Sequence, residues 1–397
     1  MKTAALEFWK NSRLRGLDAL RGLAALCVVS YHVVGAHPKP GTGGMFSWIV
    51  MPVLHAITFG YCSVFLFFVI SGFCIHLQWA KTKAAGQEPD LDFGDFWRRR
   101  LRRLYPPYLI ALVLYLVIAS LTSDVKVSAF YVWDVVSHAL MLHNLDTHTV
   151  YSINGVFWTL AIEEQLYLAY FLLLFLRKRW GWGVTLSICL ATRVAWLFLA
   201  NNLKSTYGIE TPLSEAAFTH WFTWALGAVS VEAACGLIRL PRSLSKLRFG
   251  VLALAIAIGI AFFLDNYSTA ALHDPVWVFM HPAWGIGFFI IVNYMVALEL
   301  RWSSRQTLPV WIGLFARIGL FSYSLYLIHE LVLMETWRFY FLGMSDTMTG
   351  LLVTTPLSVA CAWVFFSFCE RPFMAKSRHL RVNDNNLVQP SSLANLG

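Results

Sequence analysis

Charged residues are scarce in this sequence. Only 13% of its 397 residues are Asp, Glu, Lys or Arg, whereas 58% are hydrophobic and the mean hydropathy is +0.59. A soluble globular chain is about half apolar and about a quarter charged. The shortage of charge therefore excludes an ordinary soluble enzyme and favours a protein that crosses a membrane several times.

Signatures of several other classes are also missing. The seven cysteines form no C-x-x-C pair and lie almost entirely in apolar runs, which is typical of small buried residues rather than of disulfides or a zinc site. No helix carries the H-E-x-x-H spacing of a zinc hydrolase. The net charge of +9 comes without a nucleic-acid-binding motif, so no nucleic acid partner is expected. The absence of internal repeats counts against a transporter built from inverted halves.

Long hydrophobic runs are what the sequence does contain. A helix needs about 20 apolar residues to cross the hydrocarbon core of a membrane. We predict spans at Leu17–Val34, Thr58–Gln78, Pro107–Leu121, Val156–Leu176, Gly183–Ala200, Ala217–Cys235, Gly250–Leu264, Val276–Leu298, Gly313–Met334 and Gly350–Phe368. The first run is too long for a signal-peptide core, so we expect it to remain as an uncleaved span. The predicted fold class is all-α, a polytopic membrane protein with about ten transmembrane helices.

The basic residues predict the orientation of these spans. With a cytoplasmic N-terminus, the basic clusters all fall inside, and the outside loops contain only Lys39, Lys126, Lys204 and Arg338. Both termini are therefore expected in the cytoplasm. Residues 1–376 are expected to form a single membrane domain, and the polar residues 377–397 are expected to be a disordered cytoplasmic tail. The outside segment 125–154 is expected to hold a short interfacial helix followed by a loop.

The first span carries two polar residues on one face. Arg21 and His32 are eleven residues apart, which is about three helical turns, so their side chains point the same way. Taken singly, Arg21 could bind lipid headgroups and His32 could hydrogen-bond a neighbouring helix. Ionisable groups at membrane depth usually serve a function or a specific partner. Their shared face therefore favours a functional pair, with Arg21 near the cytoplasm and His32 near the outside.

Two further spans carry ionisable residues at a similar depth. Glu163 and Glu164 lie in WTLAIEEQLY, where Glu163 shares a face with Tyr167. His329 lies in SYSLYLIHELV, in the outer part of the ninth span. By depth, His32, Glu163 and His329 could meet in one layer, where a carboxylate would orient a histidine that transfers protons near neutral pH. A zinc site built from the same residues stays open as an alternative.

A group of arginines precedes the third span. FWRRRLRRLYPPY holds five of them, and membrane topology alone explains part of that number. Arginine also binds phosphate through a rigid fork of donors, so Arg21, Arg100 and Arg103 could converge on a polyanionic cofactor. In the second span, FVISGFCI places Ser71 and Gly72 where another helix or a ligand can approach closely.

Six short motifs, in order, make the chain resemble the acyltransferase-three family of integral membrane acyltransferases from about Leu14 to Phe373. The motifs are the Arg-x10-His pair at Arg21 and His32, S-G-F at Ser71–Phe73, R-x-x-R-x-x-P at Arg100, Arg103 and Pro106, W-S-L-x-x-E-x-x-F-Y at Trp158, Thr159, Leu160, Glu163, Leu166 and Tyr167, Y-x-L-Y-L-I-H at Tyr323–His329, and E-R-P-F at Glu370–Phe373. The departures are small: Thr159 replaces serine and keeps a hydroxyl, Leu166 replaces phenylalanine, and Ala19 stands where glycine is common.

The resemblance implies a membrane-bound O-acyltransferase. Such an enzyme moves an acyl group, by default acetyl, from cytoplasmic acyl-CoA to a hydroxyl of a cell-surface or secreted glycan or glycoside. The resemblance implies that the phosphates of acyl-CoA lie against Arg100 and Arg103, with Arg21 deeper. The pantetheine arm would then pass Ser71 and Gly72 toward His32, which acts as general base or carries the acyl group.

The same resemblance implies supporting roles and a location. Glu163 would orient or charge the histidine. Trp158 and Tyr167 would shape the pocket, and His329 would handle a second proton or pack against the site. Acetyl-CoA is the expected co-substrate and no metal is expected. The protein is expected among the lipids of the inner (cytoplasmic) membrane, as a multi-pass protein, and either a single chain or a homo-oligomer fits the sequence.

Two other function classes stay open. A proton-coupled transporter or flippase of a sugar-lipid would use His32 and Glu163 as a proton relay and would not bind acyl-CoA. A non-catalytic partner in a cell-envelope complex would tolerate replacement of both residues. The sequence assigns no role to Asp18, to Arg193 or to the histidines of segment 125–154.

Overall fold

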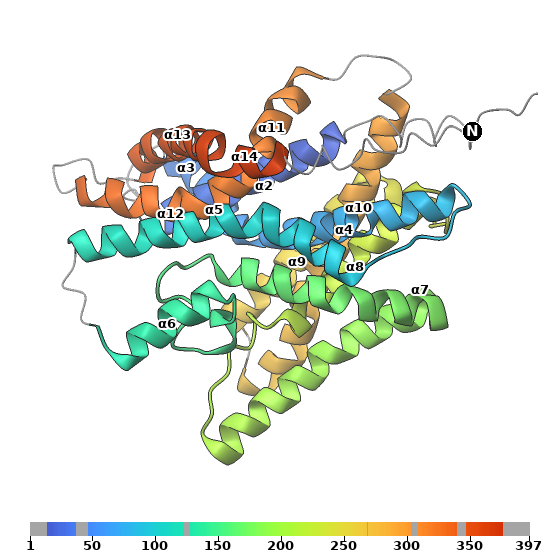
Figure 1. Cartoon of the computed structure of the whole chain (residues 1–397), viewed down its shortest axis with the longest axis horizontal. Coiled ribbons are helices and arrows are strands. Elements are labelled where there is room, and N and C mark those ends of the chain that lie inside the picture. Colours follow the sequence, from blue (N-terminus) through green and yellow to red (C-terminus); the bar gives the residue numbers. More distant parts are fainter. Residues whose placement is uncertain are drawn as a thin grey trace, which may run out of the picture.

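The computed structural model describes residues 14–36, 47–122, 127–267, 269–302, 309–339 and 347–375, and helices dominate it (Figure 1). The helices are α2 (Arg15–Ala36), α3 (Ser47–Thr58), α4 (Ser63–Ala84), α5 (Phe93–Thr122), α6 (Ala129–Ala139), α7 (Trp158–Tyr207), α8 (Ala217–Ala234), α9 (Leu247–Tyr267), α10 (Ala270–Trp302), α11 (Val310–Leu320), α12 (Ser322–Phe339), α13 (Thr347–Phe365) and α14 (Arg371–Ala375). These ranges contain no strand, so the predicted all-α class is confirmed. The predicted tail 377–397 lies outside the described residues.

Among the described residues, seven helices are long and apolar enough to cross a membrane, or eight if the bent pair α11 and α12 forms one span. Each of the ten predicted spans falls largely on helix, but Gly313–Met334 runs across α11 and α12 and the bend of 71° between them. The two counts differ partly because α7 holds two predicted spans on either side of Gly181, whose φ of 75° breaks the helix. Figure 1 shows the two arms of α7 running in opposite directions. A polytopic helical membrane fold is confirmed, while the number ten and the orientation stay predictions.

The backbones of α4 and α8 touch at two glycines. A Cβ atom at Gly72 would lie 2.0 Å from the carbonyl oxygen of Trp224, and one at Gly227 would lie 2.0 Å from that of Val69. Small residues permit this close approach, and the resulting van der Waals contact drives helix association in lipid. Gly72 therefore holds α4 against α8, and this contact sets the position of the neighbouring Ser71.

A buried ion pair ties both arms of α7 to α8 and α4. The Glu232 carboxylate accepts two hydrogen bonds of 2.7 Å from Arg177 and one of 3.0 Å from the indole of Trp182. His76 Nε2 lies 3.0 Å from the same carboxylate. Such a pair is well satisfied as it stands, but removal of one partner would leave a buried charge. We infer that this cluster holds α4, α7 and α8 together.

Arg193 has a structural role that the sequence did not reveal. Its buried guanidinium donates to the backbone carbonyls of Val278 and Trp277 in α10, at 2.8 and 2.7 Å. Pro282 has no N–H, so it cannot donate the helical hydrogen bond to the Val278 carbonyl four residues earlier. Arg193 supplies the missing donor and joins α7 to α10.

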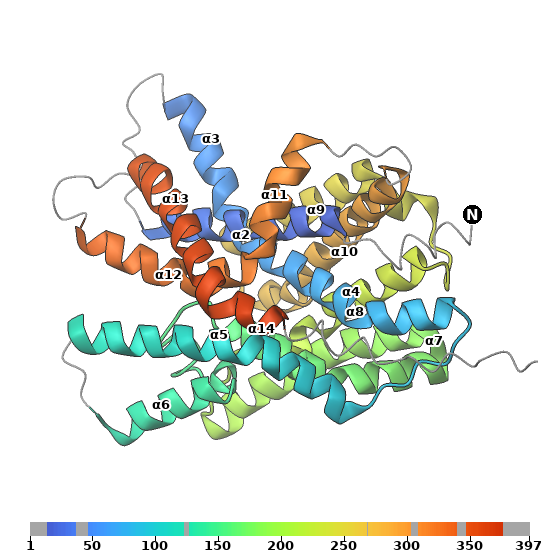
Figure 2. The same ribbon diagram turned by 45° about the horizontal axis from the view of Figure 1, so that its top comes forward.

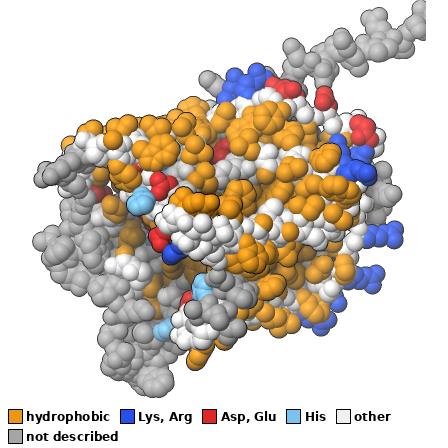
Figure 3. Space-filling view, turned by 90° about the horizontal axis from the view of Figure 1, so that it is seen from below, with side chains coloured by type: hydrophobic (Ala, Val, Ile, Leu, Met, Phe, Trp, Pro, Cys, Tyr) orange, Lys and Arg blue, Asp and Glu red, His pale blue; other side chains and the backbone are white. Residues whose placement is uncertain are grey.

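The exterior is that of a membrane protein. In the face shown in Figure 3, hydrophobic side chains cover the middle and most Lys and Arg side chains gather toward one end and its upper edge. Figures 1 and 2 both show α6 folding back beside α5, and the Tyr108 hydroxyl of α5 donates to the His138 carbonyl of α6 at 2.8 Å. A short helix in segment 125–154 is thus present.

Candidate functional site

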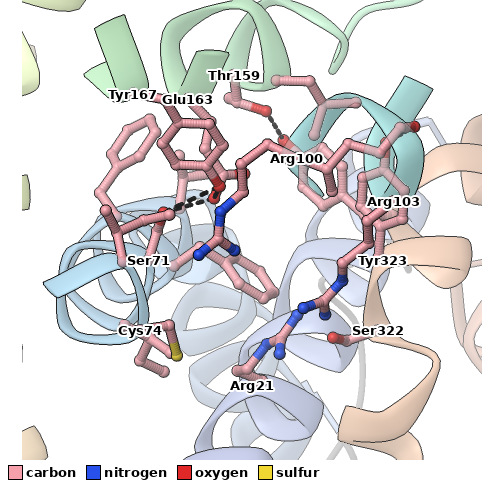
Figure 4. Close-up of a pocket in the computed structure, with 18 residues that line it drawn as sticks. Arg21, Ser71, Cys74, Arg100, Arg103, Thr159, Glu163, Tyr167, Ser322 and Tyr323 are labelled. Carbon is pink, nitrogen blue, oxygen red and sulfur yellow. Dashed lines mark hydrogen bonds between the residues drawn. The ribbon is translucent and has the colours of Figure 1, made fainter. Parts of the chain in front are cut away.

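A cavity of about 940 Å³, counting the space open to solvent, lies between α2, α4, α5, α7 and α12. Its lining includes seven residues that the sequence analysis singled out: Arg21, Ser71, Arg100, Arg103, Thr159, Glu163 and Tyr167. Figure 4 shows these side chains around the central space. Apolar side chains, including Val64, Phe67 and Ile70, form much of the remaining wall. The cavity therefore combines an arginine cluster with an apolar passage.

The three arginines come from two helices. Arg100 and Arg103 lie one turn apart on α5, and Arg21 reaches the same space from α2 (Figure 4). Within the described ranges, no carboxylate lies within 4.0 Å of any of the three guanidinium groups. By contrast, Arg99 and Arg102 are exposed on the outer face of α5. Guanidinium groups gathered without a paired carboxylate form a site for an anion such as phosphate.

Glu163 is anchored in the wall of the same cavity. The Ser71 hydroxyl donates to Glu163 Oε1 at 2.5 Å, and the Tyr167 hydroxyl donates to the same oxygen. The Trp224 indole donates in turn to the Ser71 hydroxyl at 3.2 Å. The guanidinium carbon of Arg100 lies 5.9 Å from the centre of the Tyr167 ring. These contacts fix the Glu163 carboxylate between α4, α7 and α8, on the side of the arginines.

His32 lies outside the lining of this cavity and is paired with a different carboxylate. Its Nδ1 atom is 3.4 Å from Glu330 Oε1, and the Gly155 N–H donates to Glu330 Oε2 at 2.8 Å. The rings of His32 and His329 are 5.3 Å apart. The structure thus brings His32 and His329 together, as depth along the spans predicts. The described contacts of Glu163 are instead with the cavity residues.

The remaining residues from the sequence analysis take supporting positions. Thr159 forms a 2.7 Å hydrogen bond with the Tyr326 hydroxyl at the cavity wall (Figure 4). Trp158 lies beside His220, with ring centres 6.2 Å apart, and does not line the cavity. His329 is buried, and its Nδ1 lies 2.9 Å from the carbonyl of Tyr326 in its own helix.

Two residues of this region received no role from the sequence. Glu330 follows directly after His329, and Tyr326 lies in the same motif one turn earlier. An ionisable residue beside a histidine in an apolar span was the available signal for Glu330. A tyrosine in a membrane helix gives a weaker signal, since aromatic residues are common there.

The segment before α7 holds a buried pair of histidines. The rings of His138 and His143 are stacked with centres 3.9 Å apart, and His138 Nδ1 lies 3.2 Å from the carboxylate of Asp134. Burial, and to a smaller extent the neighbouring His138, lower the pKa of His143 to about 3. Across the described residues, no three His, Cys, Asp or Glu side chains are arranged to hold a metal ion.

Comparison with known proteins gives a consistent family signal. The profile of a family described as an acyltransferase domain matches residues 14–367. The chain is 32% identical over 178 residues to a peptidoglycan O-acetyltransferase, OatA, of Listeria monocytogenes, which covers 41% of this chain and 24% of the relative. It is 25% identical over 388 residues to an O-acetyltransferase, OatA, of Staphylococcus aureus, which covers 91% of this chain and 57% of the relative.

A Bacillus subtilis protein described as a putative peptidoglycan O-acetyltransferase, YrhL, is 34% identical over 164 residues, which covers 38% of this chain and 22% of the relative. The chain thus spans between about a fifth and somewhat over half of the length of these relatives. No solved structure matches.

Proposed function

Because this chain belongs to the acyltransferase domain family, we propose that it is a membrane O-acyltransferase that uses acyl-CoA as donor and a glycan hydroxyl as acceptor. The names of its relatives favour acetyl as the acyl group and a cell-wall glycan of the peptidoglycan type as the acceptor. The bacterial inner membrane is the expected location, because acyl-CoA is cytoplasmic and such glycans are outside.

The observation that carries the proposal is the arginine cluster in an otherwise largely apolar cavity. Arg100 and Arg103 would bind the phosphates of the donor, and Arg21 would contact the donor deeper in the same cavity. The pantetheine arm, which is uncharged, would follow the wall formed by Val64 and Phe67. Glu163, which accepts hydrogen bonds from Ser71 and Tyr167, would lie beside the path of this arm.

His32 would act as the general base. With Nδ1–H directed to Glu330, the lone pair of Nε2 is available to the acceptor hydroxyl. The hydroxyl proton moves to Nε2 as the oxygen bonds to the acyl carbon. The C–S bond then breaks, and the sulfur takes the proton from the imidazolium. The Glu330 carboxylate stabilises the imidazolium while the proton is held there.

Purified protein in lipid nanodiscs, supplied with labelled acetyl-CoA and soluble peptidoglycan fragments, tests the proposal. We expect wild-type protein to bind acetyl-CoA and to form ester-linked acetate. His32→Ala should abolish ester formation and leave acetyl-CoA binding intact, whereas the control His273→Ala, on an exposed position of α10, should leave both unchanged. If folded wild-type protein binds no acetyl-CoA, acyl-CoA is not the donor. If His32→Ala forms ester at the full rate, His32 is not the general base.

A further inference from the structure

The donor cavity and His32 do not share a lining, and Tyr326 lies between them. Tyr326 lines the cavity, and its ring centre is 5.7 Å from that of His329. The His329 ring is in turn 5.3 Å from the His32 ring. Neither His32 nor Glu330 is among the residues that line the cavity. An acyl group that enters along the cavity therefore meets Tyr326 before it reaches His32.

Tyr326 is held in this position by hydrogen bonds to residues at and just before the start of α7. Its hydroxyl lies 2.7 Å from Thr159 Oγ1 and donates to the Val156 carbonyl at 3.3 Å. Its ring also contacts the ring of Phe67, with centres 5.9 Å apart. The side chain is 7% exposed. The buried Tyr326 side chain thus closes the space between the donor cavity and His329.

Tyr326 lies close to a bend in the chain. Tyr326 is on the second turn of α12, just after the bend of 71° that separates α11 from α12. His329 and Glu330 follow Tyr326 at spacings of three and four residues, on the same face of α12. A rotation of the Tyr326 side chain away from Thr159 would open the cavity toward His32 without moving the arginine cluster.

We propose that Tyr326, latched by Thr159, is a gate between the donor cavity and His32. This inference rests on the proposed function. The closed gate keeps the thioester away from water near His32, and the open position gives the acyl group access to His32. A gate of this kind limits hydrolysis, in which water replaces the acceptor: its oxygen bonds to the acyl carbon, the C–S bond breaks, the sulfur gains a proton, and a free carboxylic acid leaves.

Variants that remove one hydroxyl test the gate. In nanodiscs with acetyl-CoA and no acceptor, release of free thiol measures hydrolysis. Tyr326→Phe and Thr159→Val each remove the latch and should raise this release about fivefold, the population shift expected from the net value of one hydrogen bond. Thr159→Ser keeps a hydroxyl and should stay at the wild-type rate. Tyr108→Phe, which removes the buried hydroxyl that bonds the His138 carbonyl away from the cavity, is the matched control and should also stay there.

Each outcome of this experiment decides the proposal. Wild-type thiol release in both Tyr326→Phe and Thr159→Val overturns the gate, and so does an equal rise in Thr159→Ser or Tyr108→Phe. A loss of both hydrolysis and transfer in folded Thr159→Val also overturns it, because the hydroxyl would then serve the chemistry itself. Failure of the proposed function looks different: wild-type protein would then show neither thiol release nor ester formation from acetyl-CoA, with or without acceptor.

Discussion

Glu330 lies with one carboxylate oxygen 3.4 Å from Nδ1 of His32, although the two residues are on the ninth and first predicted spans. A carboxylate in this position fixes the histidine tautomer and stabilises the charged ring. The pairing gives Glu330 a positioning role in the proposed transfer.

Replacement of Glu330 by glutamine tests this role. The amide keeps the shape of the side chain but not its negative charge, so we expect ester formation to fall at least about 100-fold, within the range of general acid–base effects. Acetyl-CoA binding should persist, because the arginine cluster is elsewhere. Glu210→Gln, which removes an exposed carboxylate near Lys204, is the control. Unchanged ester formation by Glu330→Gln would show that His32 needs no carboxylate partner.

Gly155 is expected to be intolerant of a side chain. A Cβ atom there would lie 2.8 Å from Glu330 Oε1, which is too close, so the carboxylate would shift away from His32. Because a displacement of about 1 Å can cost up to about 100-fold in rate, Gly155→Ala should lower kcat strongly and change KM for acetyl-CoA little. Gly183→Ala, at a glycine with no atom within 4 Å of an added Cβ, is the matched control. A rise in KM with normal kcat would contradict the assignment.

The sequence predicted the helices and the arginine cluster better than the partner of His32. Periodicity and spacing place Arg100 and Arg103 on one face, and the structure shows both in one cavity with Arg21. Depth along a span, however, does not tell which way a helix is rotated. Glu163 and Glu330 both fall in the outer part of their predicted spans, and only the packing of α7 against α4 and of α12 against α2 turns Glu163 toward Ser71 and Glu330 toward His32.

Glycine and proline give further examples of what a sequence conceals. Gly72 was expected to allow close approach of another helix or of a ligand, and its missing Cβ makes room for the backbone of α8. Arg193 looked like an unexplained charge in lipid until Pro282 placed an unsatisfied carbonyl beside it. In both cases the deciding partner is far away in the sequence, so local pattern could not identify it.

The arginine cluster should recognise the nucleotide end of the donor. Arg100→Ala and Arg103→Ala remove charge-assisted hydrogen bonds to phosphate and should raise KM for acetyl-CoA about 10- to 100-fold. With S-acetylpantetheine, which lacks phosphate, wild type and variants should have similar KM values. Arg102→Ala, on the exposed face of α5, should behave as wild type with both donors. An equal loss with both donors would indicate that the arginines support the fold rather than bind phosphate.

Stability should fall in mild acid because of the stacked histidines. Burial lowers the pKa of His143 to about 3 in the folded protein, while an unfolded chain has a value of about 6.5. Between these values the unfolded state binds more protons, so the stabilisation is fully present above about pH 6.5 and is lost progressively as the pH falls toward 3. At pH 5 the loss from this one group is about 2 kcal/mol.

Thermal unfolding in detergent at pH 7.5, 6 and 5 measures this effect (conditions chosen to bracket an unperturbed histidine pKa of about 6.5). His143→Phe keeps an aromatic ring against His138 but cannot be protonated, so its unfolding midpoint should fall less between pH 7.5 and pH 5 than that of wild type. His148→Phe, at a side chain that is 78% exposed, should keep the wild-type pH dependence. Equal pH dependence in His143→Phe and wild type would mean that the acid sensitivity arises elsewhere, because removal of a buried titrating group must flatten the curve if that group is responsible.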